Sequence, residues 1–222
     1  LPNYHDLGFI FNCSYGNGLR LTNEEAYKQV MLDAGNSLIQ RFDPKVGCIR
    51  SWDVNRGWQA KRGWQFPVII DNMMNLELLF RLSEMSGNSI YKEIAISHAD
   101  RTLENHFRDD MSSYHVIDYD SISGEVRNRH TAQGFAHESS WARGQAWGLY
   151  GYTVCYRYTR DIRYLHTAEK IADFIIHHEN KPGDHIPYWD YDAAKIPDEL
   201  RDASASAIVA SALVELDGYG AL

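Results

Sequence analysis

The sequence is poor in cysteine, and its three cysteines stand far apart. Cys13, Cys48 and Cys155 are an odd number, and no Cys-x-x-Cys pair occurs. This spacing argues against a disulfide framework and a zinc knuckle, and it predicts three free thiols. No His-x-x-x-His pair occurs either, so we expect no metal site.

Long apolar runs and basic runs are missing as well. No stretch approaches the ~20 apolar residues of a membrane-spanning helix, so we expect no membrane insertion. The net charge is −8 without any Lys/Arg-rich run, which argues against nucleic acid as a partner. An anionic ligand would need a local cluster of Arg and His. The opening residues Leu1-Pro2-Asn3-Tyr4 have no basic segment followed by an apolar one, and we expect no signal peptide there.

Sequence signatures of nucleotide and serine-hydrolase sites are also absent, since no Gly-rich phosphate loop and no Gly-x-Ser-x-Gly elbow occurs. Aromatic residues, in contrast, are abundant. They make up 13% of the chain, with 14 Tyr and 6 Trp. Such residues fill cores, but Tyr and Trp also line clefts for flat or ring-shaped ligands, and composition alone leaves both uses open.

Three predicted helices share one pattern: Thr22–Phe42, Ser89–Phe107 and Asp161–His178. Each has a Tyr near its start, a small residue eight positions later and an aliphatic residue one turn beyond. These positions are Tyr27, Tyr91 and Tyr164, then Gly35, Ala99 and Ala172, then Ile39, Leu103 and Ile176. Small residues at helical spacing let neighbouring helices pack closely, so these segments read as outer helices of a repeat.

Between them lie segments that are apolar on most faces and are predicted to be buried inner helices: Ile70–Ser86, Trp141–Thr159 and Ala203–Leu216. Alternating outer and inner helices form a solenoid or a closed ring of helix pairs. A closed ring needs about twice the six or seven helices that we expect. The chain also opens in an apolar loop and stops just after a helix. We therefore expect residues 1–222 to form a single domain that is incomplete at both ends.

Two connections are long, Asp43–Pro67 and Arg108–Ser140, and long loops in a compact helical domain are usually functional. Within the second, Ser113–Arg129 is predicted to form a short β-hairpin. A further loop, Lys181–Pro197, carries several aromatic and acidic residues.

Two acidic residues have both a structural and a functional interpretation. His5-Asp6 beside a glycine is either a surface turn or a tight loop facing a cleft. Asp71 begins an otherwise apolar helix, which suits an N-cap. It is equally placed to be a carboxyl group in an apolar wall, where desolvation favours the protonated form.

The helix that follows Trp141 places Arg143 and Trp147 on one face, four residues apart. The Arg is either half of a structural ion pair with a buried acid, or it captures a substrate carboxylate while Trp147 stacks on a sugar ring. His115 and His130 flank the predicted hairpin, and lone histidines are more often packed or surface residues than catalysts.

Six short segments, in order, resemble glycoside hydrolase family 88, the unsaturated glucuronyl hydrolases. They are His5-Asp6-Leu7-Gly8-Phe9, Asp71-Asn72-Met73-Met74-Asn75, Ser113-Tyr114-His115, Thr131-Ala132-Gln133-Gly134, Ser140-Trp141-Ala142-Arg143-Gly144-Gln145-Ala146-Trp147 and Pro187-Tyr188-Trp189-Asp190. The related family 105 has a helix motif closer to W-x-R-G-N-G-W, so the Arg143–Trp147 segment favours family 88.

The resemblance implies an all-α (α/α)6 barrel with a deep pocket at the ends of its inner helices. It implies that Asp71 is the general acid/base and that Asp6 is a supporting carboxylate. The implied substrate-binding residues are His5, His115, Thr131, Gln133, Trp141, Arg143 and Trp147. His137 receives no role, and no cofactor is required.

The implied reaction removes the terminal unsaturated uronic acid from anionic oligosaccharides made by a polysaccharide lyase. It hydrates the C4=C5 double bond and so differs from ordinary two-carboxylate glycoside hydrolysis. The polysaccharide and the oligomeric state stay open, and the bacterial periplasm and cytoplasm are both compatible with the reaction. Alternatives are a family 105 hydrolase, a non-catalytic oligosaccharide-binding ring and a helical scaffold that binds protein.

Overall fold

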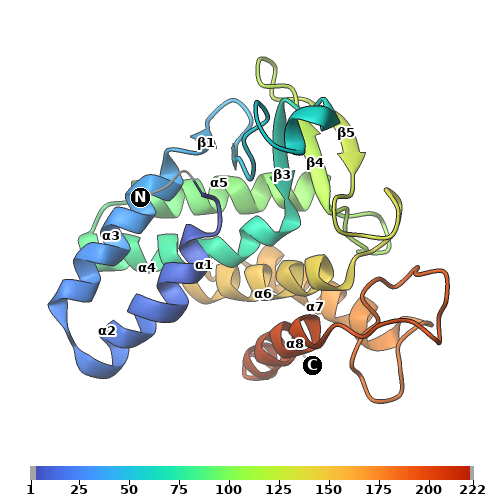
Figure 1. Cartoon of the computed structure of the whole chain (residues 1–222). Coiled ribbons are helices and arrows are strands. Elements are labelled where there is room, and N and C mark those ends of the chain that lie inside the picture. Colours follow the sequence, from blue (N-terminus) through green and yellow to red (C-terminus); the bar gives the residue numbers. More distant parts are fainter. Residues whose placement is uncertain (1–3, 221–222) are drawn as a thin grey trace.

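The computed structural model describes residues 4–220, and most of them are helical (Figure 1). The expected helical class is confirmed, but two small antiparallel sheets accompany the helices. Leu1, Pro2 and Asn3, where we expected no signal peptide, lie outside the described residues, as do the last two residues of the domain expected over 1–222. All three cysteines are free, as predicted.

The described chain begins with helix and not with the expected loop. Leu7–Phe11 (α1) continues through a π-helical turn, Asn12–Gly16, into Asn17–Thr22 (α2). The reason is a tertiary contact: Gly8 packs so closely that a Cβ there would lie 2.5 Å from the Asn75 Cα. The Phe9 N–H also donates to Asn75 Oδ1 at 3.1 Å. This docking fixes the start of the chain beside the middle of the molecule.

The three segments predicted as outer helices are confirmed as helices, Glu25–Ile39 (α3), Ile90–Asn105 (α5) and Ile162–His177 (α7). Their repeated small residues lie at helix contacts. A Cβ on Gly35 would collide with Leu82 of the neighbouring helix, and Ala99 and Ala172 are fully buried. The small positions therefore set how closely the helices approach, as their spacing predicted.

The first two inner segments are also helical, with one difference. Ile70–Asn75 (η3) is a 3₁₀ segment that leads into Leu76–Ser86 (α4), and the next inner helix is Ala142–Thr159 (α6). Helix α6 packs against η3, α4, α5, α7 and α8 and so forms the centre of the described core. A Cβ on Gly151 would collide with the Met73 side chain, which shows how tightly α6 lies on η3.

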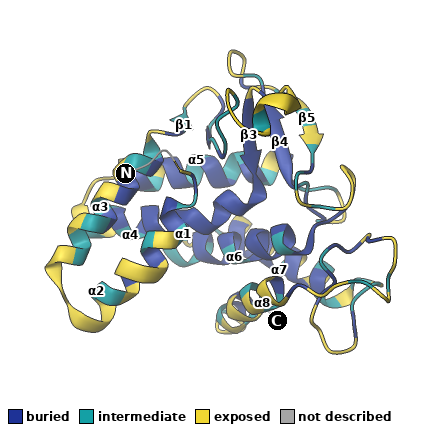
Figure 2. Cartoon of the chain, viewed as in Figure 1, coloured by how far each residue is buried: buried dark blue, intermediate teal, exposed yellow. Residues whose placement is uncertain are grey.

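The third inner helix, Ala203–Asp217 (α8), is not buried in the way that we expected. Within residues 4–220 it packs on α6 through one side, and only Ala205, Ala212 and Leu216 are buried. Its other side is exposed (Figure 2), with Val214 79% accessible. Its small Ala and Ser side chains permit close approach to α6. Because such residues occur around the whole helix, the sequence does not show whether one face or every face is buried.

A three-stranded antiparallel sheet stands above the helices near one end of α5 (Figure 1). The predicted hairpin is confirmed as Val116–Tyr119 (β4) and Val126–His130 (β5). A third strand, Phe66–Ile69 (β3), pairs with β4 and was not predicted. All four of its residues are buried, so it lacks the alternation that marks a half-exposed strand.

The remaining elements are short. Phe42–Asp43 (β1) pairs with Cys48–Ile49 (β2), and Gln59–Arg62 (η2) is a 3₁₀ turn in the long loop before β3. Strand β3 runs directly into η3, so the sheet places the first residues of η3 at the centre of the molecule. Within residues 4–220, every helix is too short or too polar to cross a membrane.

Candidate active site

A cavity of about 350 Å³ opens where the start of the chain, η3 and the N-terminus of α6 meet. Seven of the nine predicted site residues line it: His5, Asp6, Asp71, Gln133, Trp141, Arg143 and Trp147. The remaining two, His115 and Thr131, lie behind this wall. Residues that are up to 142 positions apart in sequence are thus brought to one cavity by the docking of α1 and of β3–η3 against α6.

Asp71 lies at the second position of η3 and makes no capping hydrogen bond, so the N-cap interpretation is wrong. The residue is only 5% exposed. Its Oδ1 lies 3.4 Å from His115 Nε2, and its buried Oδ2 has no hydrogen-bond partner among the described residues. Buried polar atoms are rarely left unpaired, and the exceptions gather at functional sites. The carboxyl group therefore has one buried oxygen without a partner in the described chain, in a residue that lines the cavity.

His115 is held with a defined face toward Asp71. Its Nδ1 accepts hydrogen bonds from the backbone N–H groups of Ala132 and Gln133, both at 3.1 Å. Because Nδ1 is an acceptor, the ring proton sits on Nε2, the atom that faces Asp71. The Trp141 ring lies against the imidazole with 4.7 Å between centroids, which blocks reorientation. The Nε2–H of His115 thus faces the carboxyl group at 3.4 Å without forming a hydrogen bond to it.

His5 and Asp6 are in polar contact, with 2.8 Å between His5 Nε2 and Asp6 Oδ1. His5 is buried, so the surface-turn interpretation is wrong. The ring of Trp52 meets His5 edge-on at 6.1 Å and also lines the cavity. The second carboxyl group of the site therefore arrives from the start of the chain, with its own imidazole partner.

The loop that carries Thr131 and Gln133 is held from several directions. Thr131 Oγ1 accepts from the Gly134 N–H at 2.7 Å, and the Thr131 N–H donates to His137 Nδ1 at 3.0 Å. His137, which received no role from the sequence, therefore fixes this loop. The imidazole of His130 stacks on that of His137, with 4.5 Å between ring centroids.

Asp190 is a support that sequence reasoning did not assign, although its motif was noticed. Its Oδ2 accepts from the Phe135 N–H at 2.8 Å and from Ser139 Oγ at 2.7 Å. Burial raises the pKa of this carboxyl group, and the donors that it accepts from act in the opposite direction. The available signal in the sequence was an acidic residue directly after Pro187-Tyr188-Trp189, but its hydrogen-bond partners lie about fifty residues away.

Arg143 has the acidic partner that the structural interpretation requires. Its Nε and Nη2 both donate to Asp202 Oδ2, at 3.0 and 2.8 Å. The side chain is nevertheless 38% exposed and lines the cavity, and its guanidinium lies 5.3 Å from the centre of the Trp141 ring. On the same helix face, Trp147 meets Phe9 edge-on at 5.0 Å. Arg143 therefore borders the site as an already paired cation.

Three tryptophans of the long loop before β3 were missed as a group. Trp52 stacks on Trp64 at 5.5 Å, and Trp58 packs against both at 5.1 and 5.8 Å. The density of Trp in this loop was the available signal, but only the fold brings Trp52 to the cavity. Within residues 4–220, no group of three His, Cys, Asp or Glu side chains is arranged to hold a metal ion.

No family model matches the chain. Among curated proteins, an unsaturated glucuronyl hydrolase of Formosa agariphila is 52% identical over 216 residues, covering 97% of this chain and 53% of the relative. A crystal structure of an unsaturated glucuronyl hydrolase specific for heparin superposes with a TM-score of 0.92 at 49% identity, covering 97% of this chain and 56% of that one. The chain belongs to the unsaturated glucuronyl hydrolase family. It spans about half the length of the curated relatives that it matches.

A third comparison includes a bound sugar. A variant of the Streptococcus agalactiae unsaturated glucuronyl hydrolase, solved as a complex with dGlcA-GalNAc6S, has a TM-score of 0.77 and is 28% identical. It covers 99% of this chain and 51% of that one. The resemblance carried by six short segments is thus matched by overall similarity in sequence and in fold.

Proposed function

We propose that the protein containing this chain is a glycoside hydrolase that releases the terminal 4,5-unsaturated uronic acid from oligosaccharides made by a polysaccharide lyase. The observation that carries this proposal is the Asp71–His115 pair: a buried carboxyl group with one unpartnered oxygen at a tryptophan-lined cavity. Family membership supplies the substrate class, since relatives are named for unsaturated glucuronyl and chondroitin substrates.

In the proposed reaction, protonated Asp71 donates its proton to C4 of the unsaturated sugar. Positive charge develops at C5 and the ring oxygen, and a water deprotonated by the same carboxylate adds at C5. The hemiketal then opens and releases the neighbouring sugar. His115 Nε2–H, 3.4 Å from Asp71 Oδ1, orients the carboxyl group and leaves the other oxygen for proton transfer.

Asp6, paired with His5, is the second carboxyl group of the proposed site and holds the water near C5. Trp141 and Trp147 provide flat faces for the sugar ring, and Gln133 supplies amide hydrogen-bonding groups at the cavity. We assign the substrate carboxylate to the exposed side of the Arg143 guanidinium, opposite Asp202. No cofactor is required for this sequence of steps.

We infer that the helices described here are part of an (α/α)6 barrel, because the sequence pattern predicts that outer and inner helices alternate along the chain, as they do in such a ring. The exposed side of α8 and the half-length match to relatives agree with a ring to which this chain contributes one part. We place the enzyme in the periplasm or cytoplasm of a bacterium that degrades anionic polysaccharides.

The test is substitution of Asp71 by Asn, which keeps the size of the side chain but removes its acid. In the intact protein we expect turnover of unsaturated disaccharides to fall by about three orders of magnitude or more, on the scale of losing an acid–base catalyst, while binding persists. Loss of ultraviolet absorbance by the conjugated double bond follows the reaction directly.

The choice of disaccharides separates the alternatives. Wild-type turnover of glycosaminoglycan disaccharides is the expected result. Turnover of a rhamnogalacturonan disaccharide alone would assign the protein to family 105-like chemistry. Binding without turnover of any disaccharide would leave a sugar-binding ring, and an active Asn variant would end the assignment of Asp71.

A further inference from the structure

Residues 131–134 form a loop at the cavity whose backbone rests on histidine nitrogens. The Thr131 N–H donates to His137 Nδ1 at 3.0 Å, and the N–H groups of the next two residues donate to His115 Nδ1, both at 3.1 Å. Three consecutive backbone donors therefore depend on two imidazole acceptors. Gln133 lines the cavity, so the shape of this loop decides where its amide lies.

His137 is one member of a stacked pair of histidines. His130, at the end of β5, lies against it with 4.5 Å between ring centroids and 29° between ring planes. His130 Nδ1 accepts from Trp64 Nε1–H at 2.9 Å. Because each ring has an N–H donor aimed at its Nδ1, each carries its proton on Nε2 and is neutral. A proton added to either Nδ1 would face a donor.

The surroundings of His130 disfavour a charge on this member of the pair. Burial lowers the pKa of His130, and the neighbouring His137 and Arg62 act in the same direction, while Asp118 opposes them. Proton uptake at this ring would also break the hydrogen bond from the indole. His130 is therefore a neutral surface against which the second imidazole stacks.

His137 is the ring that solvent reaches, because it is exposed. Arg108 Nη2 donates to its backbone carbonyl at 3.5 Å and lies 3.6 Å from Glu138 Oε2, so a cation and an anion compensate one another beside it. The buried Asp190 carboxyl group accepts from the N–H two residues earlier at 2.8 Å. Proton uptake would turn His137 Nδ1 into a donor that points at the Thr131 N–H, so one hydrogen bond would be lost and two donors would oppose each other.

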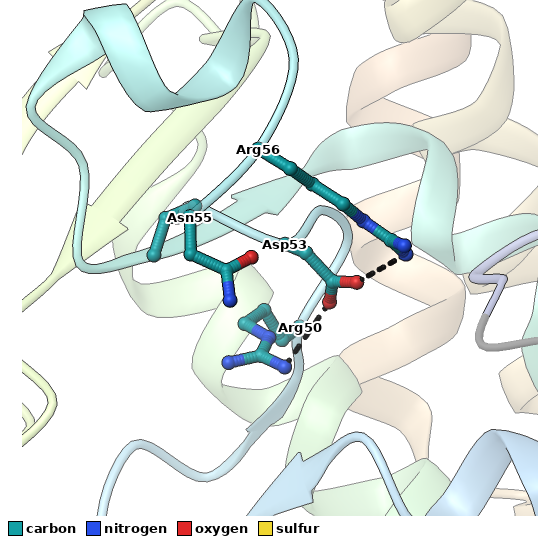
Figure 3. Close-up of a pocket in the computed structure, with 5 residues that line it drawn as sticks. Arg50, Asp53, Asn55 and Arg56 are labelled. Carbon is teal, nitrogen blue, oxygen red and sulfur yellow. Dashed lines mark hydrogen bonds and ion pairs between the residues drawn. The ribbon is translucent and has the colours of Figure 1, made fainter.

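The histidine pair also rests on a second part of the cavity wall. Trp64 stacks on Trp52 at 5.5 Å, and Trp52 lines the cavity. The long loop that carries both indoles is held by ion pairs of its own, in which Arg50 and Arg56 contact Asp53 at 3.2 and 2.7 Å (Figure 3). The pair of imidazoles therefore connects residues 131–134 to a loop that is itself fixed.

We propose that His137 is a positioning residue for the reaction and that it acts only as a neutral imidazole. As the acceptor of the Thr131 N–H, it keeps residues 131–134 in the shape that presents Gln133 and holds His115. When His137 takes up a proton, the loop loses this support, and turnover falls as the pH drops below neutrality. This inference rests on the proposed function, because His137 acts on that reaction through Gln133 and His115.

Two substitutions in the intact protein separate the acceptor from its titration. His137→Asn keeps a side-chain oxygen on the γ-carbon that can accept from the Thr131 N–H but cannot take up a proton, whereas His137→Leu removes the acceptor. At about pH 8, we expect kcat/KM on an unsaturated disaccharide to fall about tenfold in His137→Leu and to stay near the wild-type value in His137→Asn. Towards about pH 5.5, the ratio of kcat/KM in His137→Asn to that in the wild type should rise about fivefold, because only the wild type loses its acceptor.

His166→Asn is the matched control, because His166 is an exposed histidine on α7, and its pH profile should equal that of the wild type. Hydrogen exchange at the Thr131 amide, corrected for its intrinsic rate, needs no substrate. Its protection should fall towards acid pH in the wild type and stay constant in His137→Asn.

Unchanged kcat/KM in His137→Leu, or parallel pH profiles for His137→Asn and the wild type, would overturn the role of His137. Absence of wild-type turnover on every unsaturated disaccharide would instead contradict the proposed function. In that case equal protection of the Thr131 amide at both pH values in the wild type would overturn the role of His137 as well, so the two can fail independently.

Discussion

The Arg143 guanidinium is shared between a buried partner and the cavity wall. Its two hydrogen bonds to Asp202 Oδ2 tie the first turn of α6 to the N-cap of α8, where Asp202 Oδ1 also accepts from the Ala205 N–H at 2.8 Å. The sequence left an ion pair and a substrate contact as alternatives for Arg143, and it could not show that the acidic partner is Asp202, 59 positions away. Only substitution of each partner separates the two roles.

We expect Arg143→Ala to raise KM for an unsaturated disaccharide about tenfold, because the substrate carboxylate loses a charge-assisted partner. Asp202→Asn also removes the ion pair, but it keeps the guanidinium at the cavity, and Asn still caps a helix. KM should therefore stay near the wild-type value in that variant. Equal KM values for both variants would assign Arg143 to structure alone.

Two buried histidines connect α5 to the two sheets: His98 lies within the helix, and His106 directly follows its last residue. The Ile49 N–H of β2 donates to His98 Nδ1 at 3.1 Å, and His106 Nε2–H donates to the Val68 carbonyl of β3 at 3.1 Å. Burial lowers the pKa of each imidazole to about 3. Both rings are therefore neutral in the folded protein, whereas an unfolded histidine titrates near pH 6.5.

This difference predicts how stability depends on pH. Above about pH 6.5 neither state protonates these rings, and the full stability is present. Between about pH 6.5 and 3 the unfolded state binds more protons, so the free energy of unfolding falls as the pH falls. The loss approaches about 1.4 kcal/mol per pH unit for each histidine. Urea unfolding at a series of pH values measures this slope.

A substitution separates the contribution of one histidine to the pH dependence of the free energy of unfolding from the contribution of the carboxyl groups. His106→Gln keeps an N–H that can reach the Val68 carbonyl but cannot titrate. Between about pH 6.5 and 3, the slope of its unfolding free energy against pH should therefore be smaller by up to about 1.4 kcal/mol per pH unit, which corresponds to one proton. His166→Gln, at an exposed position of α7, serves as the control and should leave the slope unchanged. A His106→Gln slope equal to that of the wild type would contradict the proposed linkage.

The same elements show where sequence periodicity succeeds and where it stops. The β4–β5 hairpin was predictable because Gly124 marks its turn, and this glycine has the left-handed φ of +78° that favours glycine. Strand β3 was not predictable, because a fully buried four-residue strand has no alternation of polar and apolar residues. The 3₁₀ character of Ile70–Asn75 was hidden too, since apolar spacing does not distinguish it from the α-helix that follows.

At the scale of the molecule, the candidate site joins parts of the chain that no local pattern connects. The motif residues were recognisable one by one because each segment resembles a family pattern. Their meeting depends on Gly8 against Asn75 and on Gly151 against Met73, which are contacts between distant helices. Trp52 escaped notice for the same reason: it lies in a loop without a periodic signal and reaches the cavity only through the fold.

Asp190 offers a test of this long-range support, because it does not line the cavity but holds the loop that does. Asp190→Asn replaces a buried carboxylate that accepts from Phe135, Ser139 and Asp192 with an amide that has one fewer acceptor. The loop then loses part of its anchoring, and Gln133 loses its fixed position. We expect kcat/KM on unsaturated disaccharides to fall about tenfold or more, the scale of a misplaced positioning group.

Asp184→Asn is the control within the same segment, because Asp184 is exposed and pairs only with the surface residue Arg201 among charged groups of the described chain. Its kcat/KM should stay at the wild-type value. Thermal unfolding of both variants shows whether the protein remains folded at the assay temperature. A folded Asp190→Asn variant with full activity would mean that the loop keeps its shape through His137 and Thr131 alone, and that the segment after α7 does not support the site.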